Sequence, residues 1–383
     1  MKPLLLLALS AAAVFPAFAQ QQPPPFVYPV PPDAQVVRLK DVVYSRAGGR
    51  DVQMDFYRPT SAAAGAKLPV LIFSNFIGGN PQREWNIYTG WARVATAFGF
   101  AAINPDSRND ATEEDFLALV AYLREHAAEL RVDPDRIAVY AASAHVSTAL
   151  PFLQSTRRPA AVKAATMYYG AGNVEQFRSD LPLLWVRAGL DRPGLNQAIG
   201  DLAGKAIRQN APVTLLNHAS GYHGFETLNN DETSRAVIEQ TLRFLAKAVT
   251  PEYQSAFAAG RLEAEASGAS LAGDHARAAS LYAGMVKDRG NDIRFLMSYG
   301  EALLGAKRYR EGRAQFDRVK QIGGAGPRDL GLPAARASAL DGDADAAIAW
   351  LKSIPKRFLP ASSLTDPAFD SLRSRADFKE LLQ

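Results

Sequence analysis

The sequence predicts an α/β protein, with a mostly parallel sheet between layers of helices, followed by an all-α region. Between residues 36 and 250, six short apolar runs alternate with stretches of helical character. Such runs are typical of strands buried on both faces of a parallel sheet, and these strands are joined by right-handed crossovers. The alternation therefore indicates helices on both faces of one sheet. The runs are residues 68–73, 101–104, 137–142, 164–169, 183–186 and 213–216.

Two further segments of this region have a clear pattern. Residues 52–57 alternate apolar and polar side chains, as the strand of an edge hairpin does. Residues 112–129 have helical periodicity, with Thr112 placed to cap the helix and Asp115 three residues further on. The face predicted to meet the core carries Phe116, Leu119, Val120 and Leu123.

The first 35 residues are expected to lie outside the core. Residues 1–19 have the organisation of an export signal, with Lys2, an apolar stretch over residues 4–14, and the small-residue cleavage site Ala17-Phe18-Ala19. We therefore expect an exported protein, periplasmic or secreted, without a membrane span. Residues 20–35 are rich in Gln and Pro and are expected to form an extended lead-in.

Composition argues against several kinds of site. The 383 residues include no cysteine, which excludes disulfides and cysteine-based nucleophiles or metal sites. The net charge of +4 is scattered, without a stripe of basic and aromatic residues, so no nucleic-acid partner is expected. No histidine has zinc-motif spacing, and no glycine-rich phosphate loop or dinucleotide fingerprint follows a strand. We expect neither a metal nor a cofactor.

A repeat organises residues 251–383. Residues 273–282 recur as 307–316 and again as 342–351, at offsets of 34 and 35 residues. A helix–turn–helix unit of this period resembles tetratricopeptide repeats, which implies a surface for a protein partner. Residues 366–382 are expected to form a last capping helix. One repeat position holds the small residues Ala278, Gly312 and Ala347, and another holds the large apolar residues Tyr282, Phe316 and Leu351.

Ser143 carries the strongest functional signal. It follows the apolar run 137–142 and precedes a helix-like stretch, as the nucleophile does on a strand–turn–helix elbow. A serine needs a base, and the base needs a carboxylate. Asp191 follows the run 183–186, and His223 lies in Gly221-Tyr222-His223-Gly224-Phe225. Because each follows a predicted strand, the three are expected to meet at the C-terminal edge of the sheet.

Simpler interpretations of the same residues stay open. Ser143 would also serve as a helix N-cap, and Asp191 as a turn residue close to Pro193. His223 would also fit a structural role, with His218 as the weaker candidate for the base.

The segments around these residues resemble the α/β-hydrolase superfamily. Residues 127–139 resemble the run before the nucleophile in its dienelactone-hydrolase and esterase/lipase branches. Gly189-Leu190-Asp191 is similar to the acid turn of that group, and His223-Gly224-Phe225 to its histidine motif. The resemblance covers residues 68–248. It implies an α/β-hydrolase domain over residues 36–250 and an acyl-enzyme mechanism.

The nucleophile turn departs from the family pattern Gly-x-Ser-x-Gly. Ala141 and His145 occupy the two glycine positions, where glycine relieves crowding. Ala141 adds only a methyl group. His145 is expected in the first turn of the next helix, pointing outward, with a place in the pocket as the alternative.

The oxyanion region departs as well. Residues 74–79, Ser-Asn-Phe-Ile-Gly-Gly, stand where many relatives have His-Gly-Gly. The chemistry needs backbone amides there, so Ala144 is expected to donate together with Phe76 or Ile77. Asn75, His145 and Tyr222 are possible pocket residues.

Together these features predict an exported serine hydrolase acting on small or extended carboxylic esters. Few residues separate the runs that end at 169 and begin at 183, which leaves no room for a lid domain there. A peptidase of the same fold is a variant of this prediction. The alternative from another class is a binding protein, in which the altered turn has lost catalysis and the helical repeats hold a partner.

Overall fold

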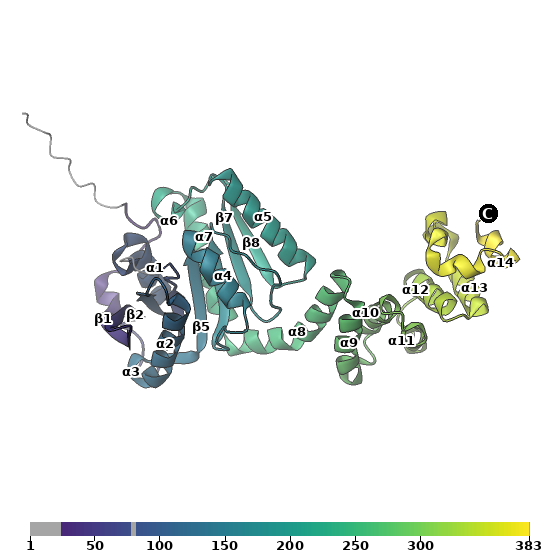
Figure 1. Ribbon diagram of the computed structural model, residues 1–383, viewed down its shortest axis with the longest axis horizontal. Helices are drawn as coiled ribbons and strands as arrows, with labels where there is room; N and C mark the ends of the chain where they lie inside the picture. The colour runs from purple at the N-terminus through teal and green to yellow at the C-terminus, as the bar shows by residue number, and fades with distance from the viewer. Residues whose placement is uncertain (1–23, 78–81, 383) are drawn as a thin grey trace, which may run out of the picture.

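The computed structural model describes residues 24–77 and 82–382, so the predicted export signal lies outside the described residues. One eight-stranded sheet forms the centre of the first part of the chain, in the order β1-β2-β4-β3-β5-β6-β7-β8 (Figure 1). The strands are β1 (Val36–Ala47), β2 (Arg50–Pro59), β3 (Leu68–Phe73), β4 (Ala101–Pro105), β5 (Val132–Ala142), β6 (Val162–Tyr168), β7 (Leu183–Ala188) and β8 (Val213–His218).

The sheet is parallel from β4 to β8, whereas β2 pairs antiparallel with both β1 and β4. This order and these directions are those of the α/β-hydrolase fold, and the predicted fold class is confirmed. No helix in the described part of the chain is both long and apolar enough to span a bilayer.

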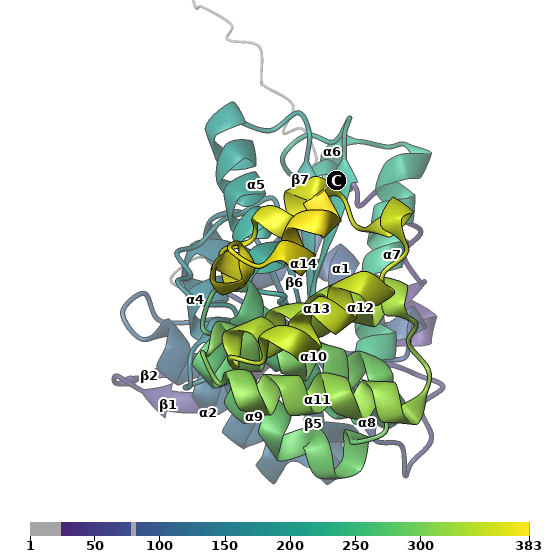
Figure 2. The same cartoon turned by 90° about the vertical axis from the view of Figure 1, so that its right-hand side faces the viewer.

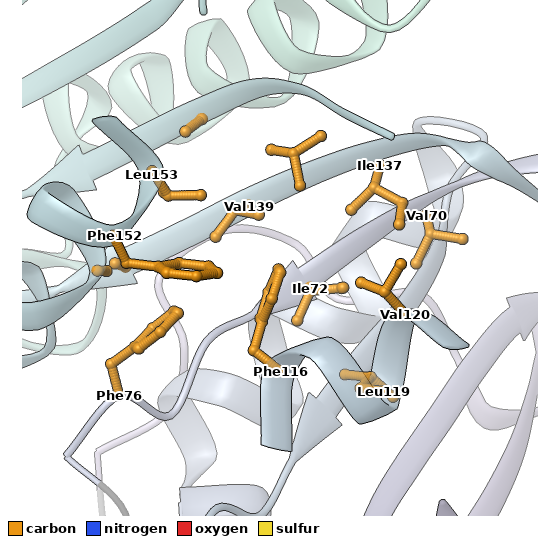
Figure 3. Close-up of a cluster of buried hydrophobic side chains, with 14 of the residues drawn as sticks. Val70, Ile72, Phe76, Phe116, Leu119, Val120, Ile137, Val139, Phe152 and Leu153 are labelled. Carbon is orange, nitrogen blue, oxygen red and sulfur yellow. The ribbon is translucent and has the colours of Figure 1, made fainter. Parts of the chain in front are cut away.

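Helices cover both faces of the sheet and bury a separate apolar core on each. One core includes side chains of α2 (Thr112–Glu125), α4 (Val146–Gln154) and α5 (Pro193–Arg208), and Figure 3 shows Phe116 and Phe152 of it packing over Val139. The other core includes α1 (Asn86–Ala97) and α7 (Glu232–Ala248). Because both faces are covered, the central parts of the inner strands are apolar, as in residues 137–142 of β5, whereas residues 133–136 near the start of β5 are mostly polar and partly exposed.

The predicted edge hairpin is present, because residues 52–57 lie in β2, which pairs antiparallel with the outermost strand β1. Three details of the other strand and helix predictions are wrong. At the other edge, β8 leaves much of residues 213–216 exposed. Thr112 is the first residue of α2 and makes no capping hydrogen bond, and the helix pattern breaks at His126 before the short α3 (Ala127–Leu130). The predicted core face of α2 is buried.

The lead-in also differs from expectation, because part of it belongs to the core. Phe26 is only 9% exposed and packs edge-on against Trp91 of α1, with the ring centroids 5.4 Å apart. The neighbouring Val27 amide donates a 2.8 Å hydrogen bond to the carbonyl oxygen of Glu226. Residues 24–35 are therefore anchored on the α/β part rather than lying free of it.

After β8, the short α6 (Phe225–Leu228) and α7 complete the α/β part, and the helical region projects from it as stacked antiparallel helices (Figures 1 and 2). The long helix α8 (Pro251–Leu271) makes the connection. The others are α9 (His275–Arg289), α10 (Ile293–Gly305), α11 (Tyr309–Ile322), α12 (Pro327–Leu340), α13 (Ala344–Ser353) and the short α14 (Ala376–Lys379).

The backbone of this region repeats with the sequence. Gly273, Lys307 and Gly342 hold equivalent turns before α9, α11 and α13, and all three have positive φ, at 81°, 61° and 87°. The small and the large apolar repeat positions are buried in each unit. The predicted capping helix over residues 366–382 is wrong, since this segment consists of 3-10 turns and the four-residue α14. Pro367 and the capping Asp366 begin a 3-10 turn there.

Candidate active site

Ser143 lies on a sharp turn at the end of β5. Its φ is +56°, in the left-handed region that non-glycine residues rarely occupy. A 3-10 turn, Ser143–His145, leads directly into α4, so the first amides of this helix lie beside the serine. The side chain is half-buried, and the next residue, Ala144, is exposed. The local backbone is therefore that of a half-buried serine held in strain at a helix N-terminus.

The structure brings Ser143, His223 and Asp191 together at the C-terminal edge of the sheet. The Ser143 Oγ lies 2.7 Å from His223 Nε2, and His223 Nδ1 lies 2.5 Å from Asp191 Oδ2. A carboxylate can only accept, so Nδ1 carries a proton and Nε2 of the neutral ring is free to accept from the serine hydroxyl. The hydrogen-bonded chain has the polarity that nucleophilic catalysis requires.

Asp191 is fixed by the turn that follows β7. Its side chain is 2% exposed, and the Arg192 amide donates a 2.7 Å hydrogen bond to Oδ1. The Leu190 amide donates to the Gly221 carbonyl at 2.9 Å, which ties this turn to the loop that carries His223. Asp191 and His223 are therefore positioned by two loops that are hydrogen-bonded to each other.

Two residues that the sequence analysis did not single out support His223 from behind. The ring of Tyr169, the residue directly after β6, lies 4.5 Å from the imidazole of His223 between centroids. Its hydroxyl donates to both carboxylate oxygens of the fully buried Glu226 at 3.0 Å, and Tyr140 donates to the same carboxylate at 2.8 Å. Burial raises the pKa of Glu226 above its usual range. Glu226 follows the Gly-Tyr-His-Gly-Phe segment directly, which is the signal that the sequence offered.

Ile77 and His145, next to the expected oxyanion hole, both differ from expectation. The Ile77 amide donates to Nδ1 of His145 at 3.2 Å, so this amide is already engaged and Phe76 is the remaining candidate donor beside Ala144. His145 does not point outward, because it is 4% exposed and meets Tyr88 edge-on. The imidazole points inward, where its Nδ1 accepts the hydrogen bond from the Ile77 amide in the loop after β3.

The other candidate residues are spread around this centre. Asn75 is 2% exposed and lines a small cavity beside Phe76, and neither polar atom of its side chain has a partner among the described residues. Tyr222 is exposed next to His223. His218 is buried and bonds to Ser234 at 2.8 Å, so it takes no part in the chain of hydrogen bonds around Ser143.

Several exposed apolar side chains lie in the segments that carry or adjoin the site residues. Of the twelve large apolar side chains that are exposed among the described residues, five belong to segments that carry or adjoin the site residues. They are Ile77, Trp85, Leu190, Tyr222 and Leu228, and we call them the apolar rim. No group of three or more potential metal ligands occurs in the part of the chain that is described.

Comparison with known proteins finds likeness in structure only. No protein-family model matches the sequence, and no curated protein matches it. A fungal esterase from Rhizomucor miehei is 16% identical, with 58% of this chain covering 86% of that chain at a TM-score of 0.48. A bacterial heroin esterase is 18% identical, with coverage of 56% and 85% and a TM-score of 0.45. An α/β-hydrolase from a Medee basin deep-sea metagenome library is 16% identical, with coverage of 56% and 99% and a TM-score of 0.45.

Proposed function

We propose that the protein is a serine hydrolase of carboxylic esters that works through Ser143, His223 and Asp191. The observation that carries the proposal is the continuous chain of hydrogen bonds from Ser143 Oγ through His223 to the buried Asp191. A serine placed on a positive-φ turn, with a base within 2.7 Å, has the geometry of an activated nucleophile.

The reaction follows from that geometry. Ser143 Oγ attacks the ester carbonyl carbon while its proton passes to His223 Nε2, and Asp191 stabilises the imidazolium that forms. The amides of Ala144 and Phe76 receive the negative charge on the carbonyl oxygen. When the tetrahedral intermediate collapses, Nε2 returns the proton to the leaving alkoxide. Water repeats the sequence on the acyl-serine, and the carboxylic acid leaves.

The apolar rim supports esters with an apolar acyl or alkyl group as the substrates. Burying one methylene group against such a surface contributes at most about 0.8 kcal/mol. Two additional methylene groups, the difference between acetate and butyrate, would then raise kcat/KM by up to about 15-fold. Export, and a partner for the helical repeats, are part of the proposal as predicted from the sequence.

The test is hydrolysis of p-nitrophenyl acetate and butyrate, together with labelling by a fluorophosphonate. Ser143→Ala is expected to abolish both turnover and labelling, and Asp191→Asn to lower kcat by several orders of magnitude. Leu190→Ser and Leu228→Ser should reduce the preference for butyrate, whereas Leu39→Ser, an exposed residue of β1, should not. Folded protein that neither hydrolyses these esters nor labels at Ser143 would refute the proposal and favour the binding role.

A further inference from the structure

The loop after β3 is tied at two points to the segment that carries Ser143. At its start, the amide and the hydroxyl of Ser74 both donate to the Tyr140 carbonyl at 2.9 Å. Three residues further on, the Ile77 amide donates to His145 Nδ1 at 3.2 Å. Tyr140 and His145 lie on either side of Ser143 in the sequence, so the loop and the nucleophile turn form one unit.

Phe76 lies between these two ties. Its ring is 3% exposed and stacks with Phe116, and it also packs against Phe152 of α4. The side chain therefore points into the core, while the backbone runs between the anchored residues 74 and 77. An oxyanion donor must lie within a few tenths of an ångström of its best position, because a misplacement of about 1 Å costs roughly a hundredfold in rate.

We infer that His145 is a positioning residue that holds the loop after β3 so that the Phe76 amide faces the carbonyl oxygen of an ester bound at Ser143. This inference rests on the proposed esterase function. His145 stands where the family pattern has a glycine, and a glycine would offer the Ile77 amide no side-chain acceptor. The structure therefore assigns a use to the larger of the two departures in the nucleophile turn.

The state of the imidazole fits this role. Nδ1 accepts from the Ile77 amide only when it carries no proton. Burial lowers the pKa of His145 to about 4, which keeps the ring neutral at ordinary pH. Tyr88 of α1 is the ring that meets it, with centroids 6.5 Å apart, and burial raises the pKa of Tyr88 so that it too stays neutral.

The test compares His145→Ala, which removes the acceptor, with His145→Asn, whose Oδ1 can take the place of Nδ1. We expect kcat for p-nitrophenyl butyrate to fall about 10- to 100-fold in His145→Ala, with KM changed by less than about threefold. His145→Asn should recover kcat to within about fivefold of the wild type. His126→Ala changes a histidine that stacks on Tyr122 at the C-terminal end of α2 and serves as the matched control.

A second readout does not depend on turnover. Amide hydrogen exchange in the peptide that contains residues 74–77 should be slow in the wild type and in His145→Asn, and faster in His145→Ala. Unchanged kcat in His145→Ala, or an equal loss in His145→Asn, would overturn the inference while leaving the esterase proposal intact. Failure of the proposed function has a different signature, because the folded wild type itself would then neither hydrolyse these esters nor be labelled at Ser143.

Discussion

The contact between Phe26 and α1 gives the sharpest test of the fold, because it joins the lead-in to the core. Phe26 is 9% exposed, and truncation of a buried phenylalanine to alanine costs about 3–5 kcal/mol. The segment is close to the end of the described chain and can relax, so we expect about 3 kcal/mol for Phe26→Ala. This corresponds to roughly a hundredfold increase in the unfolding equilibrium constant.

The facing residue allows a double-mutant cycle. A methyl group on Gly90 would lie 2.6 Å from both Cβ and Cγ of Phe26, so Gly90→Ala should cost about 1–3 kcal/mol by overpacking. In the Phe26→Ala background the ring is gone and the lead-in can move away. The same change should then be nearly neutral there, because alanine has the better helix propensity.

Urea unfolding followed by tryptophan fluorescence measures these costs. Three of the four tryptophans, at positions 85, 91 and 185, lie in the α/β part, and Trp91 contacts Phe26 directly. We expect a coupling of at least about 1 kcal/mol between the two substitutions. Costs that add within about 0.5 kcal/mol, or a Phe26→Ala variant as stable as the wild type, would show that the lead-in is not part of the core.

Three further predictions concern the site. Gly170→Ala should lower kcat about 10- to 100-fold, because the added methyl would lie 2.4 Å from the Ser143 carbonyl oxygen, whereas Gly200→Ala, with nothing within 4 Å, should leave kcat unchanged. Tyr140→Phe should cost about 1.5–3 kcal/mol in urea unfolding, since it takes a donor from the buried Glu226 carboxylate, and a loss below about 0.5 kcal/mol would contradict that bond. The pKa of His145 is about 4 in the folded chain, compared with 6.5 for an ordinary histidine. As the pH drops from 6.5 to 4, the unfolded chain therefore binds this proton first, and the free energy of unfolding should fall by about 3 kcal/mol. His145→Asn should flatten this part of the pH–stability curve.

The positions of Ser143, Asp191 and His223 could be predicted because chain order and strand ends determine them. Each residue follows an apolar run, and the carboxyl ends of neighbouring parallel strands meet at one edge of a sheet. The prediction therefore needed only the strands and their direction. The edge hairpin was also predicted, from the alternation in residues 52–57, but the strand order and the position of β1 as the outermost strand required the structure.

Other features depend on partners that are distant in sequence. Phe26 stands in a Pro- and Gln-rich stretch whose composition indicates exposure. It is buried because Gly90, which has no side chain, lets the Phe26 ring pack directly against α1. Asp115 was expected to support the start of α2, but its carboxylate binds the backbone amide and the guanidinium of Arg108. The sequence gives no local sign of either partner, since burial and pairing follow from tertiary contacts rather than from propensity.

The absence of both glycines from the nucleophile turn does not by itself indicate a lost activity. Glycines in such a turn make room for the chain that passes it. Here the passing chain, after β6, supplies the room instead, because a methyl group on Gly170 would lie 2.5 Å from Val146 Cγ2, and one on Gly172 would lie 2.8 Å from the Val146 carbonyl oxygen. With the space provided from that side, position 145 is free to carry a side chain, and His145 uses it to hold the Ile77 amide. The departure at position 145 therefore has a structural basis, since the glycines after β6 accommodate the turn and the histidine fastens the neighbouring loop to it.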